Sequence, residues 1–258
     1  MSLAGRPDAW IKSFRAGGER LRLFCFPYAG GGPQVFQTWG AWLPPRVGLH
    51  AVHLPGRGTR LNELPLHRLE PIVVAIVRAL RPMQDLPFAF FGHSMGALLA
   101  FETTRALRLG SAGPSLLIAS GCRAPPLIEE REKIHDLSDA AFIRKLVELG
   151  GTPEEVLEHR ELLDLLLPTL RADFAVIDTY RYSPAALLAC PVTVISGSTD
   201  AHASRSTMDA WQLQTSNRVS FREIEGGHFF VHSAEHELAK IVADELDRCM
   251  APGVVSAW

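Results

Sequence analysis

Three side chains of the types that perform nucleophilic catalysis together stand far apart in this sequence: Ser94, Asp200 and His228. A serine hydroxyl is a weak nucleophile at neutral pH, so it needs a base within hydrogen-bond reach. The base in turn needs an acidic group that orients it. The sequence therefore predicts nucleophilic catalysis, with Ser94 as nucleophile, His228 as base and Asp200 as the orienting acid.

Ser94 lies at the centre of Gly-His-Ser-Met-Gly, residues 92–96. A wholly apolar run, residues 88–91, precedes it, and a small and apolar helical run follows to about Leu109, closed by Gly110. A serine at a sharp strand-to-helix turn takes a strained backbone conformation, for which glycines two residues to either side leave room. The helix N-terminus would favour developing negative charge. This context favours a nucleophile over a serine that only caps a helix.

Other residues compete for the acid and base roles. Asp173 and Asp178 are rival acids, but both fall in helical stretches, whereas Asp200 directly follows an apolar strand. His202 is the main alternative base because it is close to Asp200 in the sequence, and His93 is expected to shape the turn around the nucleophile. The carboxyl ends of parallel strands meet at one sheet edge, which favours Asp200 and the histidine that follows the next strand.

A metal site is the alternative reading of His228, His232 and His236, which are spaced four residues apart. A zinc site of the His-Glu-x-x-His kind has glutamate after the first histidine, and Phe229 stands there instead. We therefore expect no metal.

The oxyanion formed when a serine attacks a carbonyl needs two preorganised hydrogen-bond donors. The first predicted donor is the backbone N–H of Met95, directly after the nucleophile. The second is expected from the loop after the first confident strand, where three glycines, residues 30–32, follow Tyr28 and Ala29. Glycines allow a backbone turn and close approach to a ligand, and Ala29 is the predicted donor.

Composition narrows the class of protein. The chain has 258 residues, 47% of them hydrophobic, with a formal net charge of −2, which suits one large domain without general attraction to nucleic acid or anionic membrane. No apolar run approaches the roughly 18 residues of a membrane span, and no signal peptide is recognisable. The four scattered cysteines are expected to be buried free thiols in a reducing compartment: Cys25, Cys122, Cys190 and Cys249. We expect a cytoplasmic protein.

Strands and helices alternate along most of the chain, after an irregular lead over residues 1–20. Strands are expected at 21–26, 49–54, 88–91, 115–121, 191–196 and 218–224, and helices at 34–43, 69–80, 94–109, 204–213 and 233–249. This alternation predicts an α/β fold with a doubly wound, mostly parallel sheet.

The alternation stops over residues 123–185, where only helices are expected: 139–149, one beginning at 152–155, 160–167 and 169–182, the last two separated by Pro168. Five leucines between positions 162 and 167 cover more of a helix than one core-facing stripe needs. We expect a helical lid inserted into a single domain whose core is 1–122 and 186–258. Ordinary helices on one sheet face are the alternative.

The chain order Ser, Asp, His is that of the α/β-hydrolase fold. Five stretches carry a family pattern, in chain order: Phe26-Pro27-Tyr28-Ala29-Gly30-Gly31, Pro55-Gly56-Arg57, Gly92-His93-Ser94-Met95-Gly96, Leu170-Arg171-Ala172-Asp173-Phe174 and Gly227-His228-Phe229-Phe230. Together they resemble the type II (editing) thioesterases of polyketide and nonribosomal peptide assembly lines, and look most like the actinomycete polyketide members. One departure is Ala201, where the family usually has proline after the acid.

The resemblance implies hydrolysis of stalled or aberrant short acyl groups from the phosphopantetheine thiol of acyl or peptidyl carrier proteins. It implies carrier-protein partners, a monomer, and no cofactor of the enzyme's own. Carrier proteins are acidic, so a basic patch near the lid is expected; scattered solvated charge is the alternative. Its candidates are Arg123, Arg131, Lys133, Arg144 and Lys145.

Three other functions remain open from the sequence. A general esterase of the same fold would prefer free esters, and a terminal thioesterase domain would release or cyclise a finished product. A non-catalytic binding module would use the scaffold without the chemistry, which the complete Ser, Asp and His set disfavours.

Overall fold

A seven-stranded sheet forms the centre of the molecule in the computed structural model, which describes residues 9–108, 113–151 and 159–250. The strands are β1 (Ile11–Arg15), β2 (Leu21–Phe26), β3 (Val47–Val52), β4 (Phe88–His93), β5 (Leu116–Ser120), β6 (Val192–Gly197) and β7 (Val219–Ile224). Their order is β1-β3-β2-β4-β5-β6-β7, and all neighbours are parallel except β1 and β3. The predicted α/β fold with a mostly parallel sheet is confirmed.

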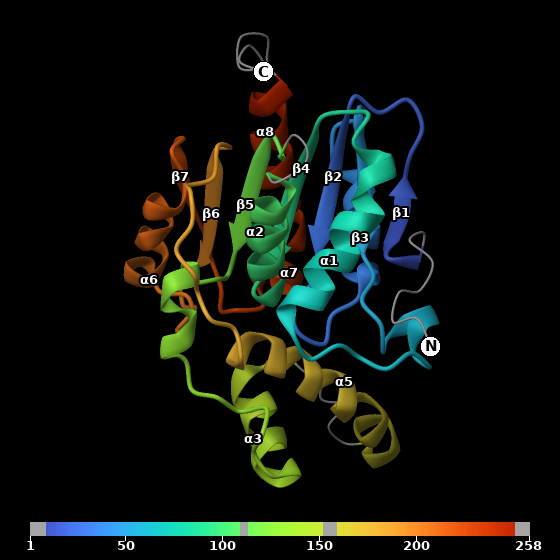
Figure 1. The fold of residues 1–258 in the computed structure, drawn as a ribbon, viewed down its shortest axis with the longest axis vertical. Helices are drawn as coiled ribbons and strands as arrows, with labels where there is room; N and C mark the ends of the chain where they lie inside the picture. The colour runs from blue at the N-terminus through green and yellow to red at the C-terminus, as the bar shows by residue number, and fades with distance from the viewer. Residues whose placement is uncertain (1–8, 109–112, 152–158, 251–258) are drawn as a thin grey trace.

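Helices cover both faces of the sheet (Figure 1). On one face α1 (Leu69–Leu80) and α2 (Met95–Leu107) pack with the sheet into one buried apolar cluster. On the other, the 3-10 helix η2 (Pro33–Ala41) and α8 (Glu235–Met250) form a second cluster. Every residue of β3, β4, β5 and β6 is buried, which explains why these strands lack polar alternation. The segments between the strands and the longer helices contain shorter helices: η3 (Gly58–Arg60), η4 (Arg81–Met83), η5 (Pro125–Glu130), α6 (Arg205–Asp209), η6 (Ala210–Gln214) and α7 (Phe230–Ser233).

The irregular lead expected over residues 1–20 is wrong for its second half, because β1 pairs antiparallel with β3 and forms one edge of the sheet. Arg15 explains the pairing. Its guanidinium donates to the carbonyls of Gly40, Pro44 and Val47 at 2.6–2.9 Å, which fastens this short polar strand to the loop before β3. The five-residue segment has too little apolar patterning to be recognised from sequence.

The two helices expected on either side of Pro168 are one helix, α5 (Arg160–Asp178). Proline removes one backbone hydrogen bond and strains the turn before it, at a cost of about 3 kcal/mol. Buried leucines on both sides, Leu163 and Leu167 before it and Leu170 after it, belong to the same core cluster and hold the helix together. The helix expected to begin at 152–155, and the expected end of α2 at Leu109 and Gly110, lie outside the described residues.

Between β5 and β6 the described residues contain η5, α3 (Asp139–Leu149) and α5 but no strand. Figure 1 shows α3 and α5 beyond the carboxyl ends of the strands, at the lower end of the view. Within the described part of the chain, no helix is long and apolar enough to cross a membrane. The four cysteines are buried and free, as predicted.

Candidate active site

The turn between β4 and α2 forces Ser94 into an unusual backbone conformation, with φ 54° and ψ −118°. It is the only non-glycine residue with positive φ among the described residues. A Cβ at Gly92 would lie 2.3 Å from the carbonyl oxygen of Gly96, and one at Gly96 would lie 2.0 Å from that of Phe26. Both positions therefore have room only for glycine. The backbone conformation of Ser94 costs about 1–3 kcal/mol, a strain that is typical of residues at functional sites.

Ser94, Asp200 and His228 form one hydrogen-bonded chain. His228 Nε2 lies 3.0 Å from Ser94 Oγ, and His228 Nδ1 lies 2.8 Å from Asp200 Oδ2. Because a carboxylate only accepts, Nδ1 carries the proton and Nε2 is free to accept one from the serine hydroxyl. Loops after β4, β6 and β7 supply the three residues, so the parallel strand ends bring them together.

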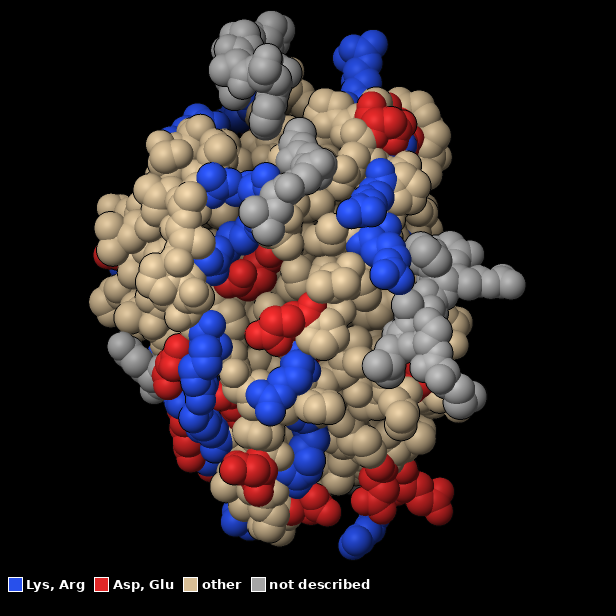
Figure 2. Space-filling model, in the orientation of Figure 1, with Lys and Arg blue, Asp and Glu red and all other residues tan. Residues whose placement is uncertain are grey.

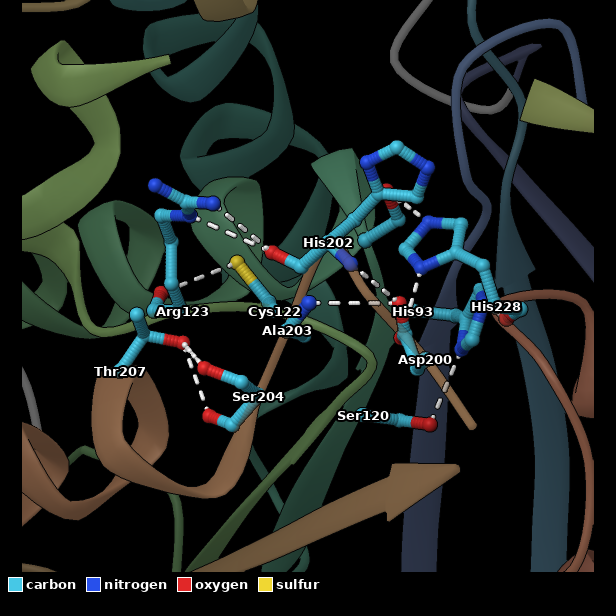
Figure 3. A network of polar contacts seen from close by, with 11 residues as sticks. His93, Ser120, Cys122, Arg123, Asp200, His202, Ala203, Ser204, Thr207 and His228 are labelled. Atoms are coloured by element: carbon cyan, nitrogen blue, oxygen red, sulfur yellow. Dashed lines mark hydrogen bonds and ion pairs between the residues drawn. The ribbon is translucent and has the colours of Figure 1, made fainter. Parts of the chain in front are cut away.

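Asp200 is held by more than the histidine. Its Oδ1 accepts the backbone N–H groups of His202 and Ala203 at 2.8 and 3.2 Å, as Figure 3 shows. Burial alone would raise the pKa of Asp200, but the hydrogen bond and charge of His228, with these two N–H groups, hold it below its ordinary value. The side chain is thus an oriented carboxylate at neutral pH.

His93 fixes the backbone behind the site. Its Nε2 lies 2.9 Å from the carbonyl oxygen of His228, so Nε2 carries the proton, and Nδ1 accepts from the Ser120 hydroxyl at 2.9 Å (Figure 3). Burial, then the nearby His228, lower the pKa of His93 well below its ordinary value. A neutral His93 therefore ties the β7–α7 loop to the ends of β4 and β5.

The rival residues take other positions. The His202 ring lies edge-to-face against the His228 ring, with ring centroids 5.5 Å apart. The histidine that hydrogen-bonds to Ser94 Oγ, among the described residues, is His228 and not His202. His232 Nε2 lies 2.7 Å from the Tyr28 hydroxyl, and His236 lies against Trp42. No group of three or more His, Cys, Asp or Glu residues in the described part of the chain could hold a metal ion.

An apolar cavity of about 740 Å³, including its open mouth, lies over the serine. Ser94, Met95, Ala29 and His228 are among the residues that line it. Its walls come mainly from α2, η5, α3 and α5, and include Leu98, Ile128, Leu146, Leu149, Leu170, Phe174 and Ile177. Met95 opens α2, so its backbone N–H has no partner within the helix. Both predicted oxyanion donors thus belong to residues at the cavity that contains Ser94.

The five basic residues expected near the lid lie in different surroundings, with Lys133 and Arg144 exposed. Arg123 and Arg131 line the cavity, and Arg123 donates to the carbonyl of His202 at 3.1 Å. Lys145 on α3 forms ion pairs with Glu132 and Glu148, each at 3.0 Å. Figure 2 shows basic and acidic side chains interspersed over the lower part of the molecule, where Figure 1 places α3. This view shows mixed charge there rather than a continuous basic patch.

The sequence did not predict the surroundings of Asp173. This carboxylate on α5 is 1% exposed and forms a two-pronged ion pair with Arg57, with both N–O distances 2.7 Å. Its Oδ2 also accepts the backbone N–H of Gly30 at 2.7 Å. The available signal was a single acid within the apolar stretch 172–177, a position where a charge needs a buried partner.

Asp178, the other rival acid, anchors a different segment. It is also buried, and its Oδ2 accepts the N–H groups of Ile134 and His135 at 2.8 and 3.0 Å. The two rival acids therefore hold the helical segment in place and lie apart from the Ser94–His228–Asp200 chain.

A mostly parallel sheet, a serine at a strained strand-to-helix turn and a Ser, Asp, His order at the strand ends define the molecule as an α/β-hydrolase. The thioesterase domain family model matches residues 21–247. The chain therefore belongs to the thioesterase family, and within it to the type II thioesterases of nonribosomal peptide and polyketide biosynthesis.

Three relatives support this assignment. The chain is 39% identical to the gramicidin S biosynthesis protein GrsT of Aneurinibacillus migulanus, over 91% of this chain and 92% of that protein. It is 38% identical to thioesterase PikA5 of Streptomyces venezuelae, over 92% and 85% of the two chains. The structure of YbtT, a type II thioesterase from the yersiniabactin pathway, aligns with a TM-score of 0.84 at 31% identity, over 94% of this chain and all of YbtT.

Proposed function

We propose that this enzyme hydrolyses short acyl thioesters carried on the phosphopantetheine thiol of acyl or peptidyl carrier proteins, and so removes stalled or aberrant groups. The observation that carries the proposal is the hydrogen-bonded chain from Ser94 Oγ to His228 to Asp200, whose serine and histidine line an apolar cavity. Membership of the type II thioesterase family supports the substrate class.

In the first half of the proposed reaction, Ser94 Oγ attacks the thioester carbonyl while His228 Nε2 takes the hydroxyl proton. The negative charge on the carbonyl oxygen is stabilised by the backbone N–H groups of Met95 and Ala29. The carbon–sulfur bond then breaks, and His228 returns the proton to the departing thiol. The acyl group is left as an ester of Ser94.

In the second half, His228 takes a proton from water, and the resulting hydroxide attacks the acyl ester through a second oxyanion. The bond to Ser94 Oγ breaks, the serine recovers its proton from His228, and the free acid leaves. Asp200 keeps the proton on Nδ1 and stabilises the imidazolium formed in each half. Besides the substrate and one water molecule, the reaction as written uses only the chain's own side chains and backbone, without a cofactor.

We propose that the helical segment between β5 and β6 acts as the lid. Apolar side chains from α3 and α5 form much of the cavity wall, which suits an aliphatic acyl chain. Arg123 and Arg131 add positive charge at the same cavity. A carrier protein would approach from the side that admits its pantetheine arm to Ser94.

The proposal is tested by comparing one short acyl group on a carrier protein, on free pantetheine and as a simple ester. We expect the highest kcat/KM with the carrier protein. A preference for the simple ester would instead identify a general esterase, and no hydrolysis of the short acyl group in any of the three forms would contradict the proposal and favour an enzyme that releases finished products. Ser94→Ala serves as the control for background hydrolysis in all three assays.

A further inference from the structure

The loop that supplies the predicted oxyanion donor is fastened to helix α5 by buried polar contacts. Asp173 Oδ2 accepts the N–H of Gly30 at 2.7 Å, and Arg57, paired with the same carboxylate, donates to the carbonyl of Gly31 at 2.9 Å. The Arg57 and Asp173 side chains are 6% and 1% exposed, so water competes little for these bonds. One carboxylate therefore anchors the loop directly and also through Arg57.

These contacts determine where the N–H of Ala29 points. The N–H of Gly31 donates to the carbonyl of Tyr28 at 2.9 Å. That carbonyl shares a planar trans peptide unit with the N–H of Ala29, so the two groups point in opposite directions. Holding residues 30 and 31 therefore directs the Ala29 N–H away from the turn.

Helix α5 contacts a second loop through the same face. Thr169, four residues before Asp173, donates its hydroxyl proton to the carbonyl of Gly56 at 2.7 Å. Gly30 has φ +83°, and a Cβ there would lie 2.6 Å from Leu170 Cδ2, so the loop and the helix are in close contact. This part of α5 is packed against the catalytic face.

We propose that Asp173 is a positioning residue for the oxyanion site, and that it makes the orientation of the Ala29 N–H depend on the docking of α5. The carboxylate itself does not touch the reacting atoms. Its Oδ2 accepts the N–H of Gly30, and the loop fixed in this way positions the N–H of Ala29. The inference rests on the proposed function, because it assigns a role in stabilising the oxyanion of the Ser94 reaction.

The test is a matched pair of double variants, R57L/D173N and R57L/D173L. Removing one partner of a buried ion pair leaves an unpaired charge, whereas replacing both is often tolerated. Both variants lack the ion pair and the contact of Arg57 with Gly31. They differ in that the asparagine amide oxygen can still accept the N–H of Gly30, while leucine cannot.

The readouts are kcat and KM for the acyl thioester, and the rate at which a fluorophosphonate labels Ser94. We expect R57L/D173L to show kcat and labelling rate lower than R57L/D173N by about tenfold. This is less than the roughly 10²–10³ lost when an oxyanion donor is removed entirely. KM should be similar in the pair, since the apolar cavity is unchanged.

Asp178→Asn is the control for loss of a buried carboxylate from the same helix. Asp178 accepts N–H groups from Ile134 and His135, away from the oxyanion loop, so its variant should keep the wild-type labelling rate. Amide exchange in the wild-type protein gives a second measurement independent of refolding: the N–H of Gly30 should be strongly protected.

The outcomes separate the two proposals. Wild-type protein that is not labelled at Ser94 contradicts the proposed catalytic function. Wild-type protein that is labelled, with equal kcat and labelling rates in the two double variants, overturns the role of Asp173 alone. Rapid exchange of the Gly30 amide in folded wild-type protein overturns it as well.

Discussion

At the scale of single residues, the site depends on a few backbone positions that accept no alternative side chain. Ser94 has a positive φ because the strand must turn abruptly into α2. Residues 92 and 96 are glycines because a Cβ at either position would overlap neighbouring backbone atoms. His93, between them, is neutral and donates to the carbonyl of His228. The nucleophile and the base are thus positioned through adjacent residues.

Gly96→Ala tests the space argument directly. Its Cβ would lie 2.0 Å from the carbonyl oxygen of Phe26, and backbone atoms in β2 cannot move aside. We expect a loss of roughly 3 kcal/mol or more in the free energy of unfolding, measured by urea denaturation. Gly113→Ala is the matched control, because its Cβ would meet nothing within 4 Å. Equal stability of the two variants would show that the turn tolerates a side chain.

Asp200→Asn tests the orienting role of the carboxylate. The amide can occupy the same space, but its NH₂ group does not accept a proton from His228 Nδ1, and the imidazole is then favoured in the wrong tautomer. In a serine protease with such a triad, the equivalent change lowers kcat by about 10⁴. We expect a loss of similar order in steady-state kinetics, with little change in KM. A loss below about tenfold would contradict the assignment of Asp200.

At the scale of helices and strands, the sequence predicted the elements that carry strong patterning. The fully apolar strands, the glycine-flanked serine and the amphipathic α1 are all recognisable, because burial on both sheet faces or on one helix stripe determines residue type. β1 was missed because its pairing depends on Arg15 and distant carbonyls. The break expected at Pro168 was wrong because buried leucines on both sides outweigh the local cost of proline.

The leucines of α5 divide by burial, which sequence periodicity alone did not resolve. Leu163 is 6% exposed and belongs to the core, whereas Leu165 is 52% exposed. We expect Leu163→Ala to lower the free energy of unfolding by about 2–4 kcal/mol, because it leaves a cavity. Leu165→Ala should change it by less than about 0.5 kcal/mol. Thermal and urea denaturation of both variants measure the difference. A larger loss of stability in Leu165→Ala than in Leu163→Ala would contradict the assignment of Leu163 to the buried face of α5.

The candidate triad could be proposed from sequence because each member follows a strand and the strand ends share one edge. The contact between Asp173 and the oxyanion loop could not, since it joins residues 143 positions apart through a helix whose docking the sequence does not specify. Local patterns give the element in which a residue lies. Which buried charge meets which distant backbone group is decided by tertiary packing.

At the scale of the whole molecule, buried histidines link stability to pH. Burial, then the positive charge of Arg22, lower the pKa of His50 to about 4, and burial lowers the pKa of His93 well below its ordinary value. In the unfolded chain both histidines have the ordinary pKa of about 6.5. Between that pH and the lowered folded pKa, the unfolded state binds more protons, so the stability present above pH 6.5 is lost as pH falls.

We therefore expect the free energy of unfolding to decrease as the pH is lowered from about 6.5 towards 4. His50→Gln should make this decrease shallower, by at most about 1.4 kcal/mol per pH unit. Urea denaturation at a series of pH values measures the slopes. An unchanged slope in the His50 variant would contradict the contribution of that residue.

The central claim is that the acyl group passes through Ser94. The most direct measurement mixes the enzyme with a short acyl thioester on a carrier protein, quenches the reaction in acid within the first turnover, and locates the adduct by peptide mass spectrometry. We expect an acyl ester on the peptide that contains Ser94, and none in Ser94→Ala. Undiminished hydrolysis by Ser94→Ala, or an adduct on another residue, would contradict it.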